Sequence, residues 1–176
     1  MLSKTVYAAA VNNLTDARNF SAYGVQYLGF CFNPNDPAYI SPEKALEIRD
    51  WVSGPDIVAD LRGQDMDNAE NIISFMAPYA IEIDANMLEA YAHIPVPKFI
   101  HAEKIDDQHV FNDVLYIISG SCTGDAHPAC MLKGKQHALP QIQNHIEAYY
   151  ITGGTESEAG IRDLDELNDW LDRLSG

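Results

Sequence analysis

Short runs of apolar residues recur along the chain at intervals that fit an alternation of strands and helices. Eight runs have the length and the β-branched or aromatic content of buried strands. They are Val6–Val11, Gln26–Phe32, Asp56–Leu61, Ala80–Ile83, Lys98–His101, Val114–Ser119, Ala129–Lys133 and Ala148–Thr152. Strands that alternate with helical patterns indicate a parallel sheet with right-handed crossovers, and eight repeats favour its closure into a barrel.

Helical periodicity fills most of the intervals between these runs. The predicted helices are Asn13–Ala22, Ser41–Val52, Met66–Met76, Asn86–Ala92, His137–His145 and Leu164–Leu174. Ser41, followed by Pro42 and Glu43, has the order of an N-cap, a first-turn proline and an acid near the positive helix end. Asn13 and Asp65 suit the same capping role for the first and third helices.

Two intervals lack a helical pattern: Ala102–Asp113 is short and polar, and Gly120–Pro128 is typical of a loop. The chain also falls below the roughly 200 to 250 residues usual for an eight-fold barrel. We therefore predict one domain, residues 1–176, with the α/β fold of a shortened TIM-type (βα)8 barrel. The expected loss of length lies in helices five and six.

Composition and charge exclude several classes of partner. The formal charge is -15, from 11 basic and 26 acidic residues, so a polyphosphate backbone or an anionic membrane would repel the chain. The longest apolar runs are strand-sized, below the roughly 20 residues that span a bilayer, and we see no targeting signal. These features predict a cytoplasmic protein with neither a nucleic-acid nor a membrane partner.

The cysteines do not form a metal-binding pattern. Cys31 lies within a strand pattern, and Cys122 and Cys130 flank a loop with His127, which would make a poor zinc site because tetrahedral zinc usually draws on closer pairs. We expect all three to be structural or incidental thiols in a reducing compartment, with no metal and no cofactor.

Several segments resemble phosphoribosylanthranilate isomerase, a TIM barrel of tryptophan biosynthesis. The segments similar to that family are Asn13-Leu14-Thr15-Asp16-Ala17, Gly24 to Phe32, Gln64-Asp65, Gly153-Gly154-Thr155-Glu156-Ser157 and Gly160-Ile161-Arg162-Asp163. The resemblance covers nearly the whole chain and is best near its two ends. It implies the barrel fold and an isomerase ancestry.

The resemblance also locates departures from the family at its reactive positions. Ala9 occupies the place of the family's cysteine general acid, and Ser119 the place of its aspartate general base. Ala38 replaces an arginine, and Tyr150 replaces an aspartate. Each proton-transfer group contributes about 10²- to 10⁴-fold to a rate. The resemblance therefore implies a barrel without efficient isomerase activity.

The resemblance and the fold together suggest where a ligand would bind. TIM barrels commonly hold phosphate at the loops after strands seven and eight. These loops contain two ammonium groups, a threonine and three glycines: Lys133, Gly134, Lys135, Thr152, Gly153 and Gly154. They could bind a small phosphorylated or anionic metabolite. The alternative is that Gly153-Gly154 is only a strand-to-helix turn.

Charged residues are dense on the strands that would line the barrel. If inward positions follow the family's, Glu82 and Asp84 point into the barrel, and Asp60, Arg62, His101 and Glu103 can do so as well. One interpretation is a rebuilt site that binds a cation or transfers protons with Glu82, Asp84 or His101. The favoured interpretation is a structural network that pairs Glu82 or Asp84 with Lys133, Lys135 or Arg62.

Three functional hypotheses follow. The first is an isomerase-like barrel that has lost efficient isomerisation and binds an anionic ligand at its mouth. The second is a diverged sugar-phosphate isomerase or lyase that uses the mouth carboxylates. The third is a non-catalytic interaction protein, whose shortened side forms a homodimer or docks a partner.

Overall fold

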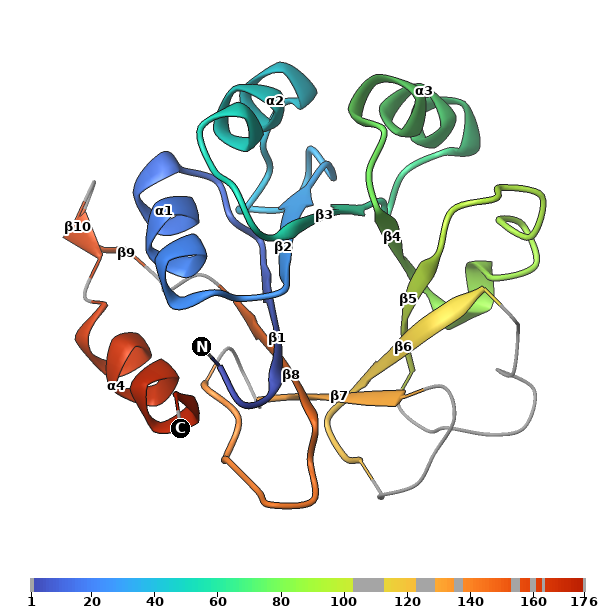
Figure 1. Cartoon of the computed structure of the whole chain (residues 1–176). Helices are drawn as coiled ribbons and strands as arrows, with labels where there is room; N and C mark the ends of the chain where they lie inside the picture. The colour runs from blue at the N-terminus through green and yellow to red at the C-terminus, as the bar shows by residue number, and fades with distance from the viewer. Residues whose placement is uncertain are drawn as a thin grey trace.

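The computed structural model describes residues 2–102, 113–122, 129–134, 138–152, 156–158, 161–162 and 164–175. Eight parallel strands form a closed barrel in chain order (Figure 1). They are β1 (Thr5–Ala9), β2 (Tyr27–Cys31), β3 (Asp56–Asp60), β4 (Ala80–Asp84), β5 (Lys98–His101), β6 (Val114–Ser119), β7 (Ala129–Lys133) and β8 (Ala148–Thr152). The barrel closes where β1 pairs with β8, from Thr5 opposite Ala148 to Ala9 opposite Thr152. The predicted TIM-type barrel is confirmed.

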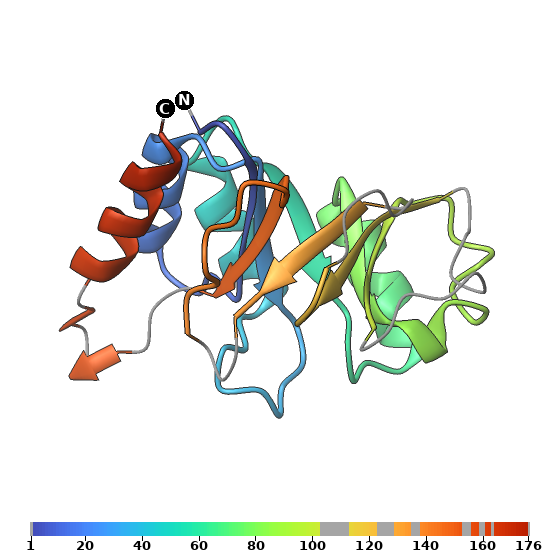
Figure 2. The same cartoon turned by 90° about the horizontal axis from the view of Figure 1, so that it is seen from below.

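Four α-helices lie among the described residues: α1 (Leu14–Tyr23), α2 (Pro42–Asp50), α3 (Met66–Met76) and α4 (Asp165–Leu174). The predicted caps are confirmed, since Asn13, Ser41 and Asp65 each accept a hydrogen bond from the backbone N–H three residues on. A short antiparallel pair, β9 (Glu156–Glu158) and β10 (Ile161–Arg162), precedes α4. Both chain ends lie at one end of the barrel (Figure 2), where Leu2 bridges Ser175.

The predicted helix Asn86–Ala92 is wrong. The chain forms only a 3-10 turn, η1 (Ala85–Met87), and continues in turns to residue 93. A buried lysine at the start of β5 holds the end of this connection. The Lys98 ammonium donates to the carbonyl oxygens of Ile94 (2.9 Å) and Val96 (3.0 Å) and pairs with Asp113. These bonds satisfy backbone carbonyls in an irregular turn, which removes the need for a helical ladder.

The predicted helix His137–His145 is also wrong, because residues 138–145 contain no helix. Pro140 lies within this segment and has no N–H to give to a helical ladder. Its carbonyl accepts a hydrogen bond from Trp170 Nε1 (2.8 Å). The backbone N–H and carbonyl of Gln143 both bond the hydroxyl of Tyr149 (2.8 and 3.1 Å). Side chains of α4 and β8 therefore take the place of helical hydrogen bonds.

Among the described residues, α-helices cover only part of the barrel. Figure 1 shows α4, α1, α2 and α3 in succession around the outside of β8 and β1 to β4. In the described part of the chain, no α-helix follows β4, β5, β6 or β7. The segments for which we predicted no regular helix five or six fall mostly on residues 103–112 and 123–128, outside the described residues. Four described helices around eight strands agree with a shortened barrel.

Strand alternation separates two apolar layers. Residues such as Val6, Leu28 and Ile81 point outward and pack under the helices and connections. Their neighbours on the same strands point inward, and the interior cluster includes Tyr7, Val58, Phe99, Ile118 and Met131. The interior is therefore filled by side chains, as in other barrels of this size.

The Tyr7 ring occupies the middle of the barrel and depends on a glycine. It is fully buried and meets Phe99 and Tyr150 edge-on, with ring centroids 5.4 and 5.2 Å away. A Cβ atom at Gly29 in β2 would lie 2.6 Å from Cε2 and 2.7 Å from Cζ of Tyr7. Gly29 therefore provides the space for the ring.

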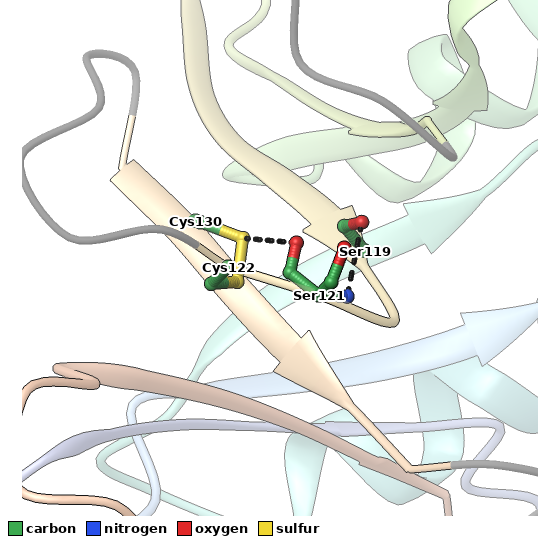
Figure 3. Close-up of a disulfide and its surroundings, with 4 residues drawn as sticks. All are labelled: Ser119, Ser121, Cys122 and Cys130. Carbon is green, nitrogen blue, oxygen red and sulfur yellow. Dashed lines mark hydrogen bonds between the residues drawn. A yellow bond between two sulfur atoms is a disulfide. The ribbon is translucent and has the colours of Figure 1, made fainter.

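A disulfide joins Cys122, just after β6, to Cys130 in β7, with 5.7 Å between their Cα atoms (Figure 3). The expectation that these two residues are thiols is wrong, because spacing alone did not show that the loop brings them together. The disulfide also removes the support that Cys122 and Cys130, taken as thiols, gave to a reducing compartment. Cys31 is a free, buried thiol as predicted. The cytoplasmic location stays a prediction; within the described residues no helix could cross a membrane, and no cluster of metal ligands is present.

We expect Cys122→Ser/Cys130→Ser to lower the free energy of unfolding by about 2–3 kcal/mol, the loop-entropy value for a cross-link over eight residues. Urea unfolding with and without reductant measures this change. The double variant serves as its own control, because it should no longer respond to reductant. Three titratable thiols in the unreduced, denatured natural chain, in place of one, would contradict the bond.

We expect Gly29→Ala to destabilise the protein by about 1–3 kcal/mol, the usual cost of overpacking a core, because the new methyl group collides with the fully buried Tyr7 ring. The matched control is Gly120→Ala, since nothing lies within 4 Å of a Cβ there. Urea denaturation compares the two variants with the natural chain. Equal stabilities for the two variants would show that Tyr7 can move aside.

Candidate functional site

The polar residues of the barrel interior gather at the carboxyl ends of the strands. Asp60 and His101 end β3 and β5, Glu82 lies near the end of β4, and Tyr150 is the third residue of β8. In a TIM barrel this end carries the active site. The sequence therefore places its charged inward residues where catalysis or binding occurs in this fold.

Glu82 is the centre of this cluster and is completely buried. Its Oε1 atom accepts hydrogen bonds from His101 Nε2 (2.5 Å) and the Tyr150 hydroxyl (3.4 Å), and it forms an ion pair with Arg62 Nη2 (3.2 Å). Its Oε2 atom accepts one from the Tyr7 hydroxyl. Three hydrogen-bond donors and one guanidinium, from four separate parts of the barrel, thus satisfy one carboxylate.

Asp60 and Arg62 form a two-pronged ion pair beside Glu82. Arg62 Nε bonds Asp60 Oδ1 (2.9 Å), and Arg62 Nη2 bonds Asp60 Oδ2 (2.7 Å). The backbone N–H of Arg62 also donates to Asp60 Oδ1 (3.1 Å). The guanidinium is 29% exposed whereas the Asp60 side chain is 7% exposed, so the cation lies nearer the solvent than the carboxylates do.

The two buried carboxyls have opposite pKa shifts. Burial alone would raise the pKa of Glu82, but the hydrogen bond and charge of His101, the charge of Arg62 and the Tyr7 hydrogen bond outweigh it and lower the pKa to about 2. Burial and the nearby charge of Glu82 raise the pKa of Asp60 to about 6, against the opposing effect of Arg62. Glu82 is therefore ionised throughout the pH range in which Asp60 titrates, and Asp60 ionises only as the pH rises toward neutrality.

Burial also raises the pKa values of the Tyr7 and Tyr150 hydroxyls, and the charge of Glu82 adds to this effect. Both phenols thus keep their protons and act as donors to the carboxylate. The sequence alone predicted neither the inward position of Tyr7 nor a role for either hydroxyl. Both tyrosines lie at positions that the alternation of side chains along a strand points into the barrel. This alternation cannot show which residue on the opposite side of the barrel a hydroxyl contacts.

The structure locates the two positions at which the family resemblance implied lost chemistry. Ala9 ends β1 and is 2% exposed, and it packs with the inward cluster. Ser119 ends β6 and is buried, but it alternates with the inward-facing Ile118. Its Oγ atom accepts a hydrogen bond from the Ser121 N–H (3.3 Å), as Figure 3 shows. Strand parity therefore assigns the inward place at the end of β6 to Ile118.

The other predicted site residues are distributed as follows. Glu82 contacts Arg62 and His101, whereas Asp84 is exposed and makes no ion pair with another described residue. The predicted pairing of Glu82 with Arg62 is present, and none with Lys133 is found among the described residues. Glu103 lies outside the described residues.

Of the six residues predicted to bind an anion, three are described. Lys133 and Thr152 end β7 and β8 with the same parity as the inward-facing Met131 and Tyr150, so both lie at the mouth. At Gly134 the chain folds back so closely that a Cβ atom would lie 2.7 Å from the Ala138 carbonyl carbon. Lys135, Gly153 and Gly154 lie outside the described residues.

Solved structures share this architecture over almost their whole length. Phosphoribosylanthranilate isomerase from Thermus thermophilus has a TM-score of 0.74 and 17% identity, over 97% of this chain and 98% of that one. The enzyme from Thermotoga maritima has a TM-score of 0.73 and 16% identity, over 98% and 99%. An isomerase structure in complex with reduced 1-(o-carboxyphenylamino)-1-deoxyribulose 5-phosphate has a TM-score of 0.73 and 18% identity, over 98% and 99%.

The fold is that of phosphoribosylanthranilate isomerase. The resemblance inferred from short sequence motifs is thereby confirmed for the architecture. No protein-family model matches the sequence, and no curated protein matches it. At identities of 16 to 18% the reaction has to be argued from the residues of this chain.

We expect the stability of the natural chain, relative to Asp60→Asn, to fall as the pH rises from about 4 to about 6. Because the folded pKa of Asp60 is raised, the native state binds more protons than the unfolded state in this window, and ionisation then costs stability. The loss of stability over this pH range should not exceed about 3 kcal/mol, because one unit of pKa shift corresponds to about 1.36 kcal/mol. Urea unfolding at several pH values measures it.

The matched control is Asp84→Asn, which removes an exposed carboxyl from the end of β4. Its stability should follow the natural chain through the same pH range. A natural chain and an Asp60→Asn variant that differ by a constant amount from pH 4 to pH 7 would contradict the raised pKa.

Proposed function

We propose that this barrel binds a small phosphorylated or anionic metabolite at its mouth and does not efficiently catalyse the isomerisation named for its structural neighbours. The observation that carries the proposal is Ala9, which lies buried and inward at the end of β1. A methyl group has no proton to transfer. The resemblance assigns a cysteine general acid to this place, so the family's reaction would lack its acid.

The base position supports the same conclusion. Neither Ser119 nor the inward-facing Ile118 carries a group that is basic near neutral pH. An acid and a base each contribute about 10²- to 10⁴-fold to a rate. Losing both removes most of the acceleration that proton transfer supplies, and binding and orientation remain.

The arrangement of charges favours an anionic ligand. Arg62 and Lys133 are partly exposed at the mouth, whereas Asp60 and Glu82 lie below them and are buried. Within the described residues, the side-chain bonds of Arg62 use Nε and Nη2, and none uses Nη1. Positive groups at the surface of an otherwise acidic chain would attract a phosphate or a carboxylate.

We expect reduced 1-(o-carboxyphenylamino)-1-deoxyribulose 5-phosphate to raise the thermal midpoint of the natural chain, because a ligand that binds only the native state stabilises it. Lys133→Gln should weaken this binding several-fold. The matched control is Lys44→Gln, since Lys44 is an exposed lysine on α2. Thermal unfolding over a range of ligand concentrations measures the effect. No shift at millimolar ligand would overturn the anion site.

The catalytic half of the proposal is tested with phosphoribosylanthranilate and the loss of anthranilate fluorescence. The natural chain should show little turnover. Ala9→Cys/Ser119→Asp restores the residues that the resemblance implies, and Ala9→Cys/Ile118→Asp places the carboxylate by strand parity. A gain in either variant supports a retained scaffold, whereas efficient turnover by the natural chain would overturn the proposal.

A further inference from the structure

His101 differs from the other members of the mouth cluster because it combines a buried partner with access to the mouth. Its side chain is 11% exposed, whereas that of Glu82 is 0% exposed. Its Nε2 atom lies 2.5 Å from Glu82 Oε1, and its ring meets Tyr150 edge-on at 5.4 Å. These contacts fix the position of the imidazole on two sides.

The contact with Glu82 determines which ring nitrogen carries the proton in neutral His101. An ionised carboxylate only accepts hydrogen bonds, so Nε2 must be the protonated nitrogen. Burial raises the pKa of Glu82, whereas the hydrogen bond from His101, the charge of Arg62 and the hydrogen bond from Tyr7 lower it, and these three still favour the carboxylate form when the imidazole is neutral. The lone pair of the imidazole is then on Nδ1, and no described residue makes a hydrogen bond to that atom.

The other titratable groups of the cluster are less suited to proton transfer. Glu82 is completely buried and cannot touch a ligand. Asp60 is engaged by both prongs of Arg62. Without His101, Glu82 keeps the hydrogen bonds from Tyr7 and Tyr150 and the ion pair with Arg62. His101 is therefore not needed to satisfy the carboxylate.

We propose that His101 transfers a proton on a small anionic α-hydroxy ketone or aldehyde bound at the mouth, with Glu82 as its positioning residue. The proposal rests on the anion site proposed above. Nδ1 removes the proton from the carbon next to the carbonyl, and the electrons of the broken C–H bond form a carbon–carbon double bond. The carbonyl oxygen becomes an enediolate oxygen. The imidazolium then returns a proton to the same carbon, which restores the carbonyl group, so no oxidant or reductant is needed.

Arg62 contributes to the same step through its charge. Its Nη2 atom and His101 Nε2 contact the same Glu82 oxygen, so the guanidinium and the imidazole lie side by side. A fixed positive group next to the carbonyl would stabilise the negative charge that develops on its oxygen. Glu82 correspondingly stabilises the imidazolium that forms on His101.

The test is deuterium incorporation from D2O into D-ribulose 5-phosphate, followed by proton NMR. The natural chain should exchange the hydrogens next to the carbonyl, and His101→Gln should lose at least about 10²-fold of this rate. Glutamine can still donate a hydrogen bond to Glu82, but it has no basic nitrogen. The matched control is His93→Gln, because His93 is an exposed histidine that also contacts a glutamate, Glu70. That variant should exchange like the natural chain.

Two further readouts separate this inference from the ligand site on which it rests. The rise in thermal midpoint with D-ribulose 5-phosphate reports binding, and it should persist in His101→Gln. Nitrogen NMR of the natural chain should show His101 protonated at Nε2 and unprotonated at Nδ1. Binding without exchange, exchange unchanged in His101→Gln, or a proton on Nδ1 in the neutral ring would each overturn the role of His101. No binding at all would overturn the anion site itself.

Discussion

The structure depends on the hydrogen bonds and the ion pair that satisfy one buried carboxylate, that of Glu82. Glu82 lies where water cannot reach it, and an unpaired charge there would cost several kcal/mol. Its four partners are Tyr7 on β1, Arg62 just after β3, His101 on β5 and Tyr150 on β8, three by hydrogen bonds and Arg62 by an ion pair. The side chains that make these contacts fill the barrel interior near the carboxyl ends of the strands, and the contacts fix the groups that face the mouth. The packing of the interior and the chemistry of the site therefore share one set of contacts.

The strands could be predicted from sequence because each is a short apolar run whose alternation or continuity is a local property. The helix N-caps could be predicted for the same reason, since Ser41 and Asp65 bond the backbone only three residues away. The helix expected around Pro140 fails because its backbone groups bond Trp170 and Tyr149, which are distant or lie on another element. No local pattern contains those partners.

The candidate site was predictable in part. Parity and the family resemblance placed Glu82 and His101 inside the barrel, and both are there. Their convergence on one oxygen with Arg62 is a tertiary fact that spacing does not contain. Asp84 has the parity of Glu82 but reaches solvent, because it is the last residue of β4. The link between Cys122 and Cys130 likewise depends on how the connection between β6 and β7 folds.

The partners of Glu82 have a consequence for how the chain folds. Tyr7 and Arg62 come from the first half of the barrel, and His101 and Tyr150 come from the second half. Strand β1 joins β8 across more than 140 residues of chain, as the bond from Lys4 to Glu147 illustrates, and such distant pairings form slowly. A half-formed barrel would hold the Glu82 carboxylate with only half of these partners and would leave it open to water. The complete set of contacts exists only in the closed barrel, so it stabilises the closed form relative to partly closed ones.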